Sequence, residues 1–128
     1  IVVVGASIGS GPACYLAERH VDVGGLVLQS GFTTPYRTIT RIRAVPVEPF
    51  PNIVRIKNIR CPKLFIHGTQ DHTVPFRHAQ AMYAKATGVK ALLPVEGAGH
   101  NDVVERLGMP AYVEAIHRFA YGDKARSN

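Results

Sequence analysis

The feature that most constrains this chain is a short β-branched run that leads directly into a glycine-flanked serine. Ile1–Val4 has the composition of a buried strand, and the next residues read Gly5-Ala6-Ser7-Ile8-Gly9. A Gly-x-Ser-x-Gly pattern between a strand and a helix is typical of a sharp turn that lifts a serine hydroxyl above the end of a sheet. We expect side chains at both Gly5 and Gly9 to collide with this turn. The Ser7 hydroxyl is therefore a candidate nucleophile.

Apolar runs and helical patterns alternate along the rest of the chain. Strands are predicted at residues 1–4, 26–29, 63–66 and 91–95. Helices are predicted at residues 10–20, 75–87 and 102–119, with a break near Gly108-Met109-Pro110 in the last. Such a series indicates parallel strands joined by right-handed crossovers. We therefore expect a single α/β domain over residues 1–128, with a mostly parallel sheet of about four strands and flanking helices.

Two of the predicted segments have particular features. The helix at residues 10–20 is expected to present one side to the sheet, made of Ala13, Leu16, Ala17 and His20. Four prolines interrupt residues 33–53, so we expect only a short helix near residues 36–43, followed by irregular chain and a turn of helix within 54–59.

The net charge of +6 is concentrated in one part of the chain. Residues 37–63 carry a single acid, Glu48, and seven basic side chains, which are Arg37, Arg41, Arg43, Arg55, Lys57, Arg60 and Lys63. A solvated surface is the plainer interpretation. The alternative is a face that meets anionic lipid headgroups, and so a membrane surface, or acidic substrates. No recognition motif accompanies the charge, so nucleic acid is not an expected partner.

The cysteines and the apolar runs bear on where the protein functions. Cys14 and Cys61 do not form a disulfide framework, and neither has a partner at metal-ligand spacing. We expect free thiols, no metal, and a reduced intracellular setting, either cytoplasmic or peripheral to a membrane. Ile1–Val4 is too short for the core of a signal peptide, and no apolar run is long enough to span a bilayer.

A candidate acid and a candidate base for Ser7 lie at the ends of two other predicted strands. A serine hydroxyl needs a base within hydrogen-bond reach and a third group that orients this base. Reactive groups of parallel sheets gather at the carboxyl ends of the strands. Asp71 follows the strand at 63–66, and His100 lies in a loop with Gly97 and Gly99 after the strand at 91–95. Each alone is an ordinary turn or surface residue, but the chain order Ser, Asp, His after separate strands indicates one site.

Asp102 is a competing acid for His100. It lies two residues further along the same loop, directly before a predicted helix. We therefore interpret Asp102 as a helix N-cap.

Three segments carry a resemblance to a known family: residues 5–12 (GASIGSGP), 67–75 (HGTQDHTVP) and 97–102 (GAGHND). With them, the chain resembles the C-terminal half of an α/β hydrolase. It is most similar to the compact branch that includes the domain-17 depalmitoylases and relatives named as serine peptidases. The resemblance extends over essentially the whole chain. It implies a partial α/β-hydrolase fold, and it identifies His67 with a structural His-Gly turn.

The resemblance also implies an activity. It indicates a serine hydrolase that cleaves an ester, thioester or amide through an acyl-enzyme, without a cofactor. Ser7 would be the nucleophile, His100 the general base and Asp71 the acid that orients it. The N–H of Ile8 would donate to the oxyanion. The implied substrates are small molecules or acylated proteins, with an esterase or thioesterase slightly ahead of a peptidase.

The same resemblance raises a non-catalytic alternative. The family's sheet has strands before the nucleophile strand, and a loop among them supplies a second oxyanion N–H. Neither is found before Ile1. The chain could thus be a catalytically inert fragment or an interaction module that retains the three residues. An open edge along Ile1–Val4 would also favour self-association through that strand, or low stability.

A remote alternative is an NAD(P) binder similar to the short-chain dehydrogenases. Gly5, Gly9 and Gly11 give a G-x-x-x-G-x-G pattern after a strand. However, no tyrosine has a lysine at the fourth position after it, and the second strand ends in Gln29-Ser30 rather than in an acid that could bind a ribose.

Overall fold

The computed structural model describes residues 1–34 and 51–122. Four parallel strands form one sheet in the order β1-β2-β3-β4. They are β1 (Val2–Ala6), β2 (Gly25–Gln29), β3 (Lys63–Gly68) and β4 (Lys90–Val95). The expected α/β fold with a parallel sheet and flanking helices is confirmed.

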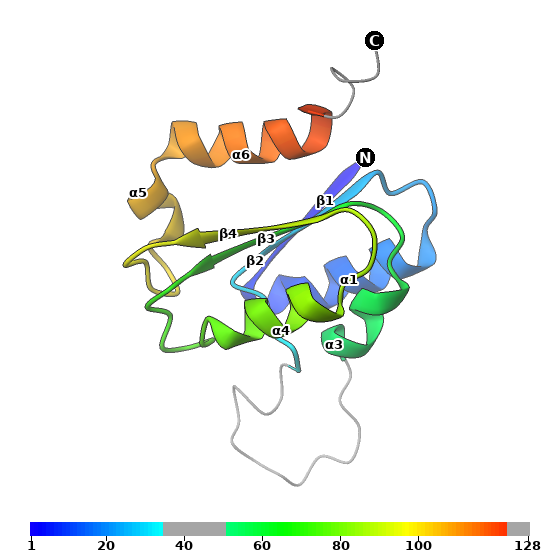
Figure 1. Cartoon of the computed structure of the whole chain (residues 1–128), viewed down its shortest axis with the longest axis horizontal. Coiled ribbons are helices and arrows are strands. Elements are labelled where there is room, and N and C mark those ends of the chain that lie inside the picture. The colour runs from blue at the N-terminus through cyan, green and yellow to red at the C-terminus, as the bar shows by residue number, and fades with distance from the viewer. Residues whose placement is uncertain (35–50, 123–128) are drawn as a thin grey trace, which may run out of the picture.

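Helices cover the two faces of the sheet unequally. Figure 1 shows α1 (Ser10–Arg19), α3 (Asn52–Arg55) and α4 (Arg77–Lys85) below the sheet. Above it lie α5 (Val103–Leu107) and α6 (Met109–Tyr121). Two short 3₁₀ segments, η1 (Ser7–Gly9) and η2 (Ile56–Asn58), complete the described elements.

Most element boundaries agree with the sequence within two residues, because β-branched runs, prolines and glycines mark them. The expected break in the last helix lies at Gly108, whose φ of 85° turns the chain between α5 and α6. The expected turn of helix at 54–59 is found as α3 and η2. The helix expected near residues 36–43, with Arg37, Arg41 and Arg43, lies outside the described residues.

The set of residues expected on the buried side of α1 is wrong in part. Leu16 is 43% exposed and His20 is also exposed, whereas the buried residues of this helix are Ser10, Gly11, Ala13, Cys14 and Ala17. The reason is the close approach of α1 to β1. A Cβ atom on Gly5 would lie 2.5 Å from Ala13 Cβ, so only small side chains fit between helix and strand.

Two hydrophobic clusters lie on opposite faces of the sheet, as the alternation of side chains along a strand requires. The lower cluster joins Leu26, Leu28 and Phe65 to α1, α3 and α4 through Ala13, Cys14, Ala17, Ile56, Ile59, Met82 and Ala86. The upper cluster consists of Val27, Leu64, Ile66, Val95, Ala98 and Val103. None of the residues of α6 is fully buried. The lower face is therefore closed and the upper face is only partly covered.

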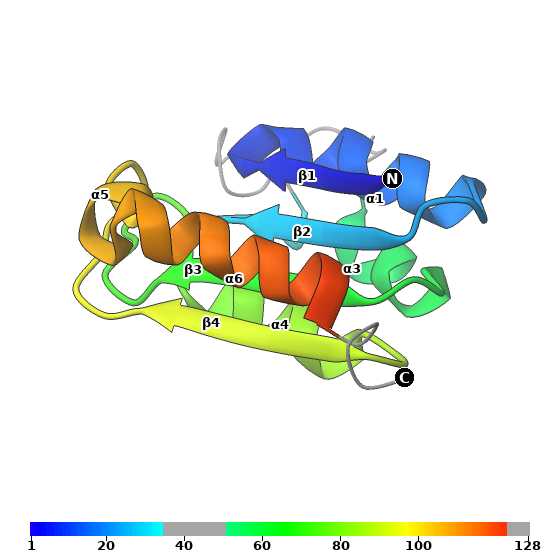
Figure 2. The same ribbon diagram turned by 90° about the horizontal axis from the view of Figure 1, so that it is seen from above.

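The open part of the upper face lies beside β1. Among the described residues β1 pairs with β2 alone, and Val4 is 49% exposed. Figure 2 shows α6 crossing over the middle of the sheet, with β1 outside its cover. A groove of about 590 Å³ lies between them, lined mainly by apolar side chains that include Val4, Val113 and Ile116.

Two residues of the basic segment 37–63 are engaged within the fold. Lys63 is 0% exposed, and its Nζ donates to the carbonyls of Cys61 and Thr87 at 2.8 Å each. Burial lowers the pKa of Lys63. Arg55 pairs with Glu18. Neither side chain is free to meet an external anion.

Both cysteines are free thiols. Cys14 is fully buried, and this burial raises its pKa to about 12. Within residues 1–34 and 51–122, no helix has the length and hydrophobicity needed to cross a membrane.

Candidate active site

Three side chains from three strand ends meet at the carboxyl edge of the sheet. Ser7 follows β1, Asp71 follows β3, and His100 follows β4. The Ser7 Oγ lies 2.9 Å from His100 Nε2, and His100 Nδ1 lies 2.8 Å from Asp71 Oδ2. The structure therefore brings the predicted serine, histidine and aspartate into one hydrogen-bonded row.

Ser7 is held in an unusual backbone conformation. Its φ is 51°, in the left-handed region that non-glycine residues seldom adopt. Such strain persists only where the surroundings enforce it, and here they include the tight packing of Gly5. A Cβ on Gly5 would lie 2.5 Å from Ala13 Cβ and 2.6 Å from the carbonyl oxygen of Gly9.

The expected collision at Gly9 is wrong. A Cβ at this position meets no atom of the described structure within 4 Å, and its φ of −64° is open to any residue. The two glycines of the pattern therefore differ, because the helix approaches the strand at Gly5 and leads away from it at Gly9.

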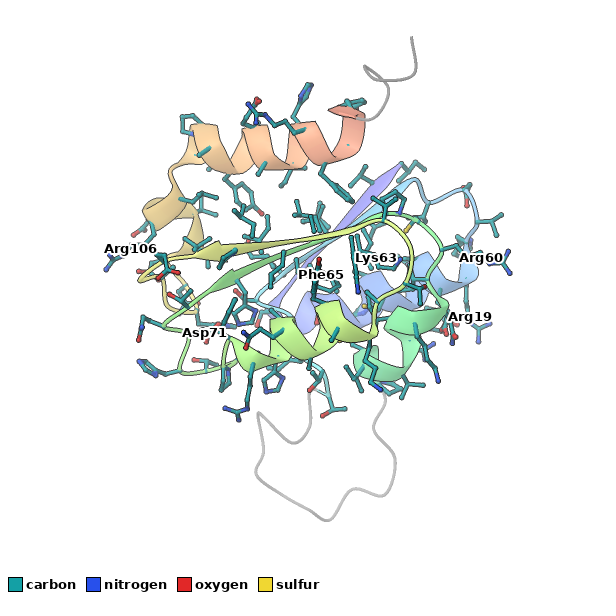
Figure 3. The ribbon with its side chains drawn as sticks, viewed as in Figure 1. Arg19, Arg60, Lys63, Phe65, Asp71 and Arg106 are labelled. Atoms are coloured by element: carbon teal, nitrogen blue, oxygen red, sulfur yellow. The ribbon has the colours of Figure 1, made fainter. Side chains whose placement is uncertain are left out.

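Asp71 uses its two carboxylate oxygens for different purposes. Oδ1 accepts hydrogen bonds from the backbone N–H groups of Thr73 at 2.9 Å and Val74 at 2.7 Å. Oδ2 accepts the bond from His100. The side chain is fully buried, and Figure 3 shows Asp71 at the opposite end of β3 from Lys63. Asp71 is thus both a turn residue and the partner of the histidine.

The loops after β3 and β4 are tied together, which fixes Asp71 relative to His100. The N–H of Gln70 donates to Ala98 O at 2.9 Å, and the N–H of Gly97 donates to Thr69 Oγ1 at 2.9 Å. Ala98 O also lies so close to Gly68 that a Cβ there would overlap it. Gly68 therefore permits the contact between the two loops.

The partners of His100 determine where its ring proton lies. An ionised carboxylate can only accept hydrogen bonds, so Nδ1 carries the proton that is donated to Asp71. Nε2 then presents its lone pair to the hydroxyl of Ser7. In this tautomer the histidine can take a proton from Ser7.

Ile8 follows Ser7 within η1, directly before α1. Its side chain is exposed. A backbone N–H in this position, next to the nucleophile and near the positive end of a helix, can donate to a negatively charged oxygen that forms on a substrate.

Two further polar residues, Asp102 and His78, have other partners than Ser7, Asp71 and His100. Asp102 is the N-cap residue of α5, as expected, although its side chain makes no capping hydrogen bond to the helix. Its Oδ1 instead accepts from the N–H of Gly99, and Oδ2 lies 3.4 Å from Arg106 Nε. His78 Nδ1 accepts from the N–H and the hydroxyl of Thr33. Burial lowers the pKa of His78.

The sequence did not indicate the role of the buried Asn52, which forms hydrogen bonds near the start of α1, the helix that follows Ser7. Its Nδ2 donates to Ser10 Oγ at 3.0 Å and to Phe32 O at 2.9 Å, and Phe32 N–H donates to the same Ser10 Oγ at 3.4 Å. Through these hydrogen bonds, Asn52 connects the first residue of α1 to the loop that follows β2. An asparagine directly after Pro51 suggests only a helix start, and no local signal indicates these distant partners.

Comparison with known proteins gives a consistent set of relatives. The chain is 36% identical over 121 residues to the human alpha/beta hydrolase domain-containing protein 17B, across 93% of the chain and 41% of that protein. It is 37% identical over 106 residues to protein 17C of Xenopus tropicalis, across 80% of the chain and 34% of that protein. The chain thus spans about two fifths or less of the length of these relatives. No family model matches it.

Solved structures share the fold. An acetyl xylan esterase from a Paenibacillus species superposes with a TM-score of 0.74 at 22% identity, across 95% of this chain and 45% of that one. The esterase domain of a Rhodothermus marinus protein gives 0.72 at 15% identity, across 91% and 59%.

Proposed function

Because the chain belongs to the α/β-hydrolase superfamily, we propose that Ser7, His100 and Asp71 form the catalytic triad of a serine hydrolase. The observation that carries this proposal is the continuous row of contacts from Ser7 Oγ to the buried Asp71 carboxylate, with distances of 2.9 and 2.8 Å.

The proposed reaction begins with attack by Ser7 Oγ on the carbonyl carbon of an ester, thioester or amide. His100 Nε2 takes the hydroxyl proton as the Oγ–C bond forms, and Asp71 stabilises the resulting imidazolium. The carbonyl oxygen becomes negatively charged and accepts a hydrogen bond from the N–H of Ile8. Collapse of the tetrahedral intermediate breaks the bond to the leaving group, which receives the proton from His100.

Hydrolysis of the acyl-enzyme repeats these steps with water. His100 takes a proton from the water as it attacks the acyl carbon, and returns this proton to Ser7 Oγ when the ester bond breaks. The substrate class is an acylated small molecule or an acylated protein. An ester or thioester is favoured over an amide, because resonance with the nitrogen makes an amide carbonyl less electrophilic.

Labelling with a fluorophosphonate tests this proposal, because the probe reacts only with an activated serine. We expect the wild-type chain to be labelled and Ser7→Ala to remain unlabelled. His100→Gln and Asp71→Asn should each slow labelling by a factor on the order of 10²–10⁴. The matched controls are His72→Gln and Asp102→Asn, which remove an exposed histidine and a second acid near the site. Both should label within about threefold of wild type.

Two outcomes would contradict the proposal. Equal labelling of wild type and Ser7→Ala would place the reactive group elsewhere. A folded wild-type chain that takes up no probe would favour an interaction module that retains the three residues without activity.

A further inference from the structure

A second histidine, His67, lies against the carboxylate of Asp71. His67 is the fifth residue of β3, and its ring is fully buried. Its Nε2 is 2.7 Å from the carbonyl oxygen of Val74 and 3.4 Å from Asp71 Oδ2. The ring of Phe76 packs edge-on against it, with centroids 5.9 Å apart. These contacts fix the ring in one place beside the candidate triad.

The hydrogen-bond partners of His67 determine which ring nitrogen carries its proton. A carbonyl oxygen only accepts hydrogen bonds, so Nε2 carries a proton and donates it to Val74 O. Burial lowers the pKa of His67, which keeps the ring neutral near pH 7. The positive end of the N–H dipole thus lies near Asp71 Oδ2 without adding a full charge beside His100.

Val74 is the link between His67 and the acid. Its carbonyl accepts from His67, and its N–H donates to Asp71 Oδ1 at 2.7 Å. The hydrogen bonds therefore continue from His67 through Val74 and Asp71 to His100 and Ser7. Asp71 Oδ2 faces His100 while Oδ1 is bound to the turn that contains Val74.

We propose that His67 is a positioning residue of the hydrolase site, which acts through Val74 to aim the Asp71 carboxylate at His100. This inference rests on the proposed function, because it gives Asp71 the role of orienting His100. The proposal gives His67, in the His-Gly turn, a role in orienting Asp71 in addition to its role in packing. A side chain of the same shape but without the N–H would leave Val74 O unpaired and let the turn relax.

The test compares variants that separate shape from hydrogen bonding. His67→Gln places an amide N–H at a similar reach, and His67→Phe keeps the ring but removes the donor. His117→Phe makes the same change on the exposed surface of α6 and serves as the matched control. The first readout is the low-field proton resonance of the His100 Nδ1–H in its bond to Asp71, identified by its loss in Asp71→Asn. The second is the rate of fluorophosphonate labelling of Ser7.

We expect His67→Phe to shift or broaden this resonance and to slow labelling by about 10–100-fold, as small misplacements of catalytic groups do. His67→Gln and His117→Phe should keep both readouts near wild type. If His67→Phe does not fold, His67→Asn replaces it. Its amide is too short to reach Val74 O, so it should lose what His67→Gln keeps.

The inference is overturned if His67→Phe, or His67→Asn in its place, only lowers the melting temperature and leaves the resonance and labelling rate unchanged. Absence of the resonance from the wild-type spectrum would overturn it too. A wild-type chain whose resonance responds as expected, but which takes up no probe, supports the positioning role and contradicts the proposed function instead.

Discussion

The strands that lead to Asp71 and to Ser7 support the candidate triad in different ways. All six residues of β3 are buried, and the loops after β3 and β4 are joined by hydrogen bonds that hold Asp71 and His100. In β1, which leads to Ser7, only Gly5 is buried. Asp71 therefore belongs to the closed part of the molecule, and the nucleophile belongs to the open part.

This difference shows where the site is most easily disturbed. Asp71 and His100 are fixed by local hydrogen bonds that a single surface change does not break. Ser7 depends on the packing of α1 against β1 and on the brace from Asn52 to Ser10. Changes beneath the nucleophile should therefore alter the site more than changes around the histidine loop.

Truncation of one apolar side chain on each face compares the two faces. Phe65 is 2% exposed on the lower face, and Val113 is 54% exposed beside the groove on the upper face. We expect Phe65→Ala to lower the free energy of unfolding by about 3–5 kcal/mol, because it removes buried apolar area and leaves a cavity. Val113→Ala should cost less than about 0.5 kcal/mol. Urea denaturation measures both, and similar losses would show that the upper face is more closed than described.

The two glycines around Ser7 give a second contrast. Gly5→Ala should lower stability by about 3 kcal/mol and abolish fluorophosphonate labelling, because its Cβ would overlap Ala13 and the carbonyl of Gly9. Gly9→Ala should change stability by less than about 1 kcal/mol and leave most of the labelling, since its Cβ meets open space. Thermal melts with labelling of the folded protein measure the difference. Equal effects at the two positions would contradict the close contact at Gly5.

The pH dependence of stability should reflect two histidines, His67 and His78, whose pKa values are lowered by burial. Below the unfolded-state pKa of about 6.5, the unfolded chain therefore binds more protons than the folded one, and stability falls as the pH falls. Each histidine contributes at most about 1.4 kcal/mol per pH unit. Urea denaturation between pH 7.5 and 5 should show this loss, and His67→Gln and His78→Gln should each make it shallower. A slope that neither variant changes would contradict this assignment.

Much of the fold could be predicted because local residue types determine it. The β-branched runs, the prolines before β3 and α4, and Gly108 mark boundaries that the structure reproduces closely. Ser7, Asp71 and His100 could be brought together because parallel strands place their carboxyl ends along one edge. Their order along the chain then fixed which strand end supplies which group.

The missed features depend on contacts between distant segments. Helical spacing could not show that α1 buries Cys14 rather than Leu16, because that choice depends on how closely β1 approaches. The same approach distinguishes Gly5 from Gly9, and the close contact of Gly68 with Ala98 joins two loops 30 residues apart. His67 and Asn52 act through partners that only the folded chain brings near.

The most direct test of the central claim is the intact mass of the protein after brief exposure to an activated acyl ester and quenching in acid. If His100 and Asp71 activate Ser7, wild type should carry one acyl group per chain, located on Ser7 by peptide mapping. Ser7→Ala should carry none, and Asp71→Asn should accumulate it on the order of 10²–10⁴ times more slowly. Acylation of another residue, or equal acylation of wild type and Ser7→Ala, would contradict the account.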